Sequence, residues 1–130
     1  MRRFLPALAT LPLALWACDD GPRPAGPPVV VPAARLASVE ARDRGRRLFL
    51  THCALCHGER ADGVGRRRNL SGRAQDFTDP SWRRRVTPAQ TYLVIREGRR
   101  GTAMAGWKIL DEAQTWDLVA YVLSVANRSG

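Results

Sequence analysis

The residues with the clearest chemistry stand together at Cys53-Ala54-Leu55-Cys56-His57. Two thiols three positions apart on a helical turn can both reach one edge of a porphyrin and add across its two vinyl groups. The imidazole that follows lies where it can coordinate the central iron. This spacing is the attachment signature of a c-type haem, and it makes Cys53, Cys56 and His57 the first candidate site residues.

Three other chemistries use the same residue types. A thioredoxin-like redox pair also has two cysteines at this spacing, but it requires a surrounding βαβ pattern that this sequence lacks. A structural zinc site needs four ligands, and the fourth would have to be His52 or a distant carboxylate. A structural disulfide would leave His57 without a role. We therefore predict one covalent haem, with a disulfide or a zinc site as the alternatives.

The third cysteine, Cys18, follows an N-terminal segment typical of export. Arg2 and Arg3 precede an apolar run over residues 4–17, which is the pattern of a secretory signal peptide and is short for a membrane span. The run ends in Leu15-Trp16-Ala17-Cys18, which is similar to a bacterial lipobox, where the cysteine is lipidated after cleavage. We expect a lipoprotein-type signal peptide over 1–17, a lipid anchor on Cys18 and a location on the periplasmic side of a bacterial membrane. The alternative is an ordinary signal peptide whose cysteine is incidental.

Composition divides the mature chain into a linker and a domain. Cleavage before Cys18 would leave 113 residues and lower the net charge from +9 to +7. Residues 19–37 contain five prolines, two glycines and few large apolar side chains, so they cannot bury enough surface to offset the entropy of ordering. We therefore predict an extended linker over 18–37, with a reach on the order of 60 Å at about 3.1 Å per residue. Residues 38–130 form the predicted domain.

The apolar spacing in this domain is helical. Five residues are spaced at i, i+4, i+7, i+8 and i+11, which places them on one face of a first helix. This stripe consists of Ala41, Gly45, Leu48, Phe49 and His52. The segments 87–90 and 111–114 each have the capping residues of a helix start, and the first of these helices should end near Gly98. A second stripe follows the later cap, at Trp116, Val119, Ala120 and Leu123.

These patterns predict an all-α fold with three or more helices. Residues 58–86 and 99–110 are rich in Gly, Arg, Asp and Pro and are predicted to be long loops. Loops of this length are uncommon in a domain of about 90 residues, and a domain of that size has a small core. A group other than side chains is therefore expected to fill the interior, and a porphyrin would do so.

The chain resembles the class I monohaem cytochromes c, particularly the small bacterial kind, over about residues 44–125. The family's first helix has a glycine followed by an aromatic residue, as at Gly45 and Phe49, and its last helix has an aromatic pair like Trp116 and Tyr121. The resemblance implies that these two helices cross closely at the glycine. Residues 58–65 resemble the loop that follows the attachment motif.

Residues 96–107 resemble the family's methionine-ligand loop and contain Met104, the single methionine after Met1. Met104 lies in a glycine-flanked segment that could approach a flat ring, whereas His52 is expected on the same side of the ring as His57. We therefore predict His57 and Met104 as the axial ligands of the iron. Packing is expected for Trp82, and Trp107 and Leu70 are expected to pack on the haem.

The sequence departs from the family at two places. Ala105 replaces the proline that usually follows the ligand methionine, which predicts a less rigid loop. Arg68-Asn69-Leu70 replaces the family's Pro-Asn-Leu, in which the proline carbonyl accepts a hydrogen bond from the proximal histidine. The carbonyl of Arg68 is the expected acceptor for His57, in a contact that tunes ligand basicity.

A His/Met ligand pair is the pattern of electron-transfer cytochromes, and it predicts a one-electron carrier rather than an enzyme. Two alternatives are a haem module or subunit of a larger oxidoreductase, and a small-ligand sensor or enzyme from which Met104 dissociates. Twenty of the 21 basic residues are arginine, and they could steer the protein to acidic redox partners or simply form a solvated surface. Export and the lack of a binding motif argue against nucleic acid, and we expect a monomer.

Overall fold

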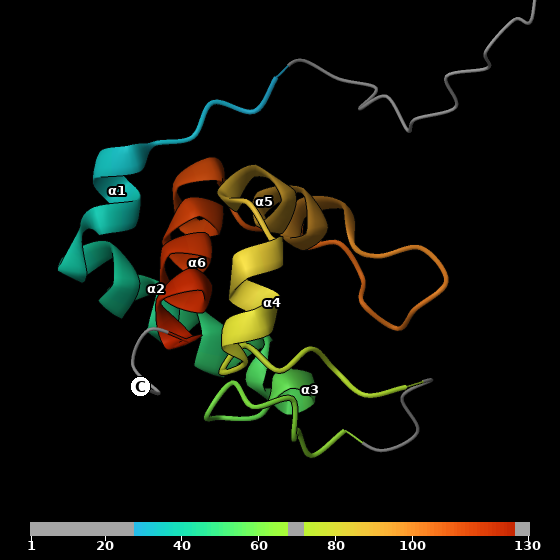
Figure 1. The fold of residues 1–130 in the computed structure, drawn as a ribbon. Coiled ribbons are helices and arrows are strands. Elements are labelled where there is room, and N and C mark those ends of the chain that lie inside the picture. The colour runs from blue at the N-terminus through green and yellow to red at the C-terminus, as the bar shows by residue number, and fades with distance from the viewer. Residues whose placement is uncertain (1–27, 68–71, 127–130) are drawn as a thin grey trace, which may run out of the picture.

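The computed structural model describes residues 28–67 and 72–126, which contain six helices, with α6 at the centre (Figure 1). The helices are α1 (Ala33–Ala37), α2 (Val39–His52), α3 (Ala54–His57), α4 (Pro80–Arg85), α5 (Pro88–Glu97) and α6 (Glu112–Val125). Within the described ranges, β pairing is limited to an isolated antiparallel bridge between Gly98 and Ala105. The predicted all-α fold is confirmed.

The two predicted capping segments begin helices as expected. At α5, Thr87 Oγ1 accepts a hydrogen bond from the Gln90 N–H (3.2 Å) and Gln90 Oε1 accepts one from the Thr87 N–H (2.9 Å). Asp111 and Gln114 exchange the same two bonds at α6, at 2.7 and 3.0 Å. These reciprocal bonds satisfy N–H groups that a helix start leaves without partners. Gly98 ends α5 with a φ of +76°, a conformation that favours glycine.

Helices α2 and α6 cross closely at Gly45, as the resemblance implied. A Cβ atom added to Gly45 would lie 1.9 Å from the carbonyl oxygen of Asp117 and 2.9 Å from the Cβ of Tyr121. One turn further along, the fully buried ring of Phe49 lies 5.2 Å from the Tyr121 ring. Trp116 instead stacks on Tyr92 of α5 at 4.5 Å. The aromatic residues of α6 therefore join this helix to both α2 and α5.

The extended part of the N-terminal segment ends before residue 37, where the sequence predicted its end. Residues 33–37 form helix α1, which packs against α6, so the extended conformation predicted for this part of the linker is wrong. The helix has no side-chain cap at its N-terminus, and its main partner, α6, is distant in sequence. The composition of the linker therefore gave no indication of it.

The predicted loop over 58–86 also contains a helix, α4. The carboxylate of Asp79 accepts hydrogen bonds from the N–H groups of Ser81 (2.8 Å) and Trp82 (3.3 Å), and Pro80 occupies the first turn. Trp82 is buried, and its ring lies 4.9 Å from that of Phe77. The packing role predicted for Trp82 is confirmed.

Several predictions lie outside the described residues. These are the signal peptide, the lipid-anchor Cys18 and the positions Arg68 and Leu70. Across residues 28–67 and 72–126, no helix has both the length and the apolar character needed to span a membrane.

Candidate functional site

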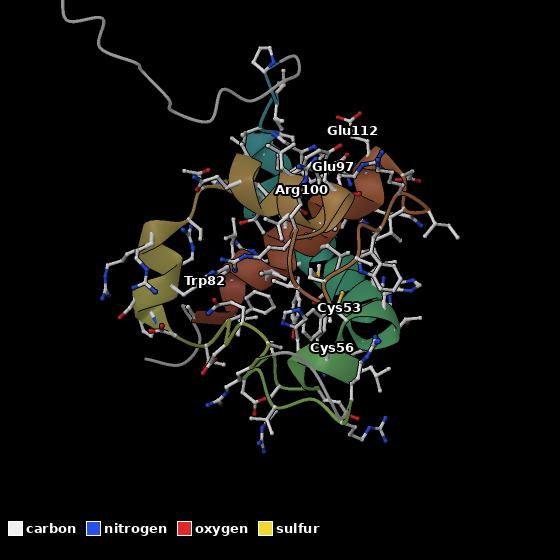
Figure 2. All side chains as sticks on the ribbon, turned by 90° about the vertical axis from the view of Figure 1, so that its right-hand side faces the viewer. Cys53, Cys56, Trp82, Glu97, Arg100 and Glu112 are labelled. Carbon is white, nitrogen blue, oxygen red and sulfur yellow. The ribbon has the colours of Figure 1, made fainter. Side chains whose placement is uncertain are left out.

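One open cavity of about 340 Å³ gathers all four predicted haem-site residues, Cys53, Cys56, His57 and Met104. The first three lie at the end of α2 and in α3, while Met104 comes from the loop between α5 and α6. Figure 2 shows Cys53 and Cys56 on one side of this open face and Trp82 on the other. The remaining walls are mainly apolar and aromatic, including Phe49, Phe77, Ile95, Leu118 and Val122.

The attachment motif forms a tight helical turn. The N–H of Cys53 donates to the Phe49 carbonyl (2.8 Å), and the N–H of His57 donates to the Cys53 carbonyl (2.9 Å). Both thiols are free and line the cavity. Burial, with a smaller contribution from Cys56, raises the pKa of the Cys53 thiol to about 12. In the described residues no three His, Cys, Asp or Glu side chains gather as metal ligands, so the structure gives no support to a zinc site.

The His57 ring is held on two sides. It stacks on Phe77 with the ring centroids 4.7 Å apart, and its Nδ1 lies 3.1 Å from the carbonyl oxygen of Gln75. Burial lowers the pKa of His57, which favours the neutral imidazole that binds metals. With Nδ1 donating to Gln75, the second ring nitrogen is free to act as a ligand.

The partner of His57 corrects a prediction. The acceptor was expected to be the carbonyl of Arg68, which lies outside the described residues, but the structure shows the carbonyl of Gln75 in that role. Loop 72–79 reaches the ring because the N–H of Phe77 donates to the Ala61 carbonyl (2.8 Å). A main-chain acceptor leaves no signature in the side-chain sequence, so residue types alone could not identify Gln75.

Main-chain contacts fasten both ends of the Met104 loop. The N–H of Arg99 donates to the Met104 carbonyl (2.9 Å), and the N–H of Trp107 donates to the Ile95 carbonyl (2.8 Å). Gly98 allows this narrow closure, because a Cβ there would lie 2.6 Å from the Met104 carbonyl oxygen. The loop therefore brings Met104 to the cavity with its two ends tied together.

His52 lies at the cavity rim. Its ring centroid is 5.2 Å from that of Trp107, and both residues line the cavity. Trp107 is therefore part of the cavity, and its packing on the haem stays a prediction. His52 lies against the loop that carries Met104, and its placement on the His57 side of the ring stays a prediction.

The cavity lining is basic. Arg67, Arg73 and Arg99 are part of it, and the lining contains no carboxylate from the described residues. Nearby acids have cations of their own: Asp62 pairs with Arg60 at 3.0 Å and Glu97 with Lys108 at 2.9 Å, for example. Among the described residues none of these three arginines forms an ion pair, and Arg73 Nη2 donates to the Asp62 carbonyl (3.4 Å).

Comparison with known proteins agrees with this geometry. The family model described as cytochrome c matches residues 42–126, so the chain belongs to the cytochrome c family. A solved structure similar to this chain is part of a reducing HAO-like protein complex from Kuenenia stuttgartiensis, with 27% sequence identity and a TM-score of 0.53. The match covers 65% of this chain and 41% of that chain, so this chain spans about two fifths of its neighbour's length.

Membership of the family means that the protein is a c-type monohaem cytochrome, with covalent haem c and a role in haem-based electron transfer. The residues of the cavity fit that cofactor. Two thiols have the required spacing, a partly buried imidazole has one nitrogen free, and the walls are mainly apolar. When bound, haem c supplies a reversible one-electron couple, while the chain contributes ligands, burial and charge.

Proposed function

We propose that the protein is a one-electron carrier whose single haem c is attached through Cys53 and Cys56 and ligated by His57 and Met104. The observation that carries this proposal is the meeting of Met104 with the attachment motif in one cavity. Two protein ligands would leave the iron no open position for a substrate, and a thioether ligand raises the reduction potential. The apolar walls limit water around the redox centre, and the rim provides contact with partners.

Replacing Met104 with alanine tests the ligand assignment. The M104A variant should lose the sulfur-to-iron charge-transfer band and have a lower reduction potential, because no second methionine is present after Met1. Ile109→Ala is a matched control, since Ile109 belongs to the same loop segment, is 85% exposed and is absent from the cavity lining. An unchanged band in M104A would overturn the assignment. Rapid carbon monoxide binding to the reduced wild-type protein would instead favour a ligand-binding sensor or enzyme.

The carrier is further proposed to be a monomer tethered by a lipid on Cys18 to the periplasmic side of a bacterial membrane. The sequence of residues 1–18 supports export and lipidation, and the basic cavity lining favours acidic redox partners. The mass of the mature N-terminus tests the lipid, and its absence would remove the tether. Electron exchange with an acidic partner should slow as salt increases, and salt-independent rates would contradict electrostatic steering.

A second candidate function is a fixed haem module of a larger oxidoreductase. The observation that favours it is the similarity to a chain that belongs to a redox complex and is more than twice as long as the matched region. Purification from solubilised membranes separates the two candidates. A free carrier should elute alone, whereas a subunit should elute with a stable partner at a fixed ratio.

A further inference from the structure

A buried carboxylate joins three helices away from the cavity. Asp117 lies on α6, and its side chain is only 5% exposed. Its carboxylate accepts a hydrogen bond from Arg35 Nη1 of α1 at 2.7 Å and two from Arg44 of α2, at 2.7 Å to Nε and 3.2 Å to Nη2. A charge removed from water in this way needs such partners. We call Arg35, Arg44 and Asp117 the latch.

Further contacts fasten the segment that carries α1. Arg35 Nη1 also donates to the Ala113 carbonyl (3.1 Å), and Arg42 Nη2 donates to the Leu36 carbonyl (3.3 Å). The side chains of Val29 and Leu36 pack against the hydrophobic core. A helix of five residues is not stable alone, so these tertiary contacts are what hold α1 in place.

The latch lies on a different side of the molecule from the cavity. None of residues 28–37 is part of the cavity lining. In Figure 1, α1 lies on one side of α6, and the loop between α5 and α6 projects on the other. The N-terminal segment therefore joins the domain well away from the loops that surround the haem site.

We propose that the latch fixes the exit point of the membrane tether, so that the α1 side faces the bilayer and the cavity mouth faces away from it. This inference rests on the lipid anchor of the proposed function. With residues 28–37 held on the domain, nine residues remain between Cys18 and Pro28. Even in an extended polyproline conformation they span about 28 Å, roughly half the reach of the whole predicted linker. The carrier is then held close to the membrane with its electron-transfer face toward partners.

Hydrogen exchange of the haem-loaded protein without its lipid tests the latch itself. In Arg35→Gln, amides in residues 33–38 should exchange at least tenfold faster, while those of α5 should be unchanged. Arg46→Gln is the matched control, because it removes one positive charge from an exposed α2 residue that makes no ion pair with the described residues. Equal exchange in Arg35→Gln and wild type would overturn the latch.

Thiol modification of the lipidated holoprotein on vesicles tests the orientation. With Cys18 lipidated and Cys53 and Cys56 bound to haem, a new cysteine would be the single free thiol. Val39→Cys, beside α1, should react with a bulky maleimide at least threefold more slowly on vesicles than in detergent. Ile109→Cys should react at equal rates in both, because Ile109 lies in the segment that carries Met104. Adding Arg35→Gln should remove the protection of Val39→Cys.

The outcomes separate the two proposals. A mature protein without a lipid on Cys18 would overturn the tether and the orientation together. A lipidated protein in which Val39→Cys and Ile109→Cys respond equally to the vesicles would overturn the orientation alone. The covalent haem spectrum of each variant shows that the domain has folded and kept its cofactor.

Discussion

Replacing Gly45 with alanine should destabilise the protein although alanine is the better helix former. The added Cβ would lie 1.9 Å from the Asp117 carbonyl oxygen, whereas real Cβ atoms essentially never come within 3.0 Å of another heavy atom. Helices α2 and α6 would have to separate by roughly 1 Å, and closely packed interiors absorb such a shift poorly. Overpacking of this kind costs about 3 kcal/mol at the upper end of its usual range. The higher helix propensity of alanine offsets about 1 kcal/mol of this destabilisation.

The expected net loss is therefore about 2 kcal/mol, the difference between these two contributions. For a domain of this size it corresponds to a fall in Tm of about 8–16 °C. Thermal unfolding of the haem-loaded protein, followed by circular dichroism, measures it. Arg46→Ala is the control, because Arg46 is exposed on the same helix and its truncation should change stability by less than about 0.5 kcal/mol. A Tm for Gly45→Ala equal to or above that of wild type would refute the close-crossing argument.

Two further predictions concern the Met104 loop and helix α4. Ala105→Pro should be tolerated, because the Ala105 N–H makes no hydrogen bond to any described residue. Proline also restricts the unfolded chain, which should add about 0.4–1 kcal/mol of stability. Loss of the sulfur-to-iron band in this variant would contradict the prediction. Hydrogen bonds from the Ser81 and Trp82 N–H groups lower the pKa of Asp79 in the folded protein. Its capping contribution is therefore complete above the ordinary pKa of 3.8 and is lost as the pH falls through the lower folded value. Amide protection in α4 should weaken only below about pH 4, and an Asp79→Asn variant, which keeps an acceptor but cannot titrate, should not show this weakening.

The three longer helices were predictable because their signals are local. Thr87 and Asp111 each precede a glutamine at the third helical position, and both capping boxes form in the structure. Asp79 and Pro80 are also residues typical of a helix start, at α4. The segment was nevertheless predicted to be a loop, because its surroundings are rich in arginine and glycine. Helix α1 carried no such signal, because the contacts that hold it include Asp117, which lies 82 residues from Arg35.

The candidate site also contains residues that the sequence indicated and residues that it did not. The attachment motif and Met104 were identifiable from residue type and spacing, and the fold brings them to one cavity. The acceptor for His57 was not, because any residue at position 75 has a main-chain carbonyl. Its selection depends on the path of loop 72–79, which is set by the Phe77 to Ala61 hydrogen bond. The sequence therefore indicated the groups proposed to hold the cofactor better than the groups that orient them.

Asp117 connects two features that would otherwise be independent. Its carbonyl oxygen limits the residue at position 45, and its carboxylate holds Arg35 and Arg44. A substitution that moves the backbone at one end of this arrangement also moves the carboxylate at the other, so the effects of Gly45→Ala and Arg35→Gln should not be additive. The attachment of the N-terminal segment to the domain is thereby coupled to the helix crossing at the centre of the domain. A change at position 35, 44, 45 or 117 alters which residues the other three positions can accept.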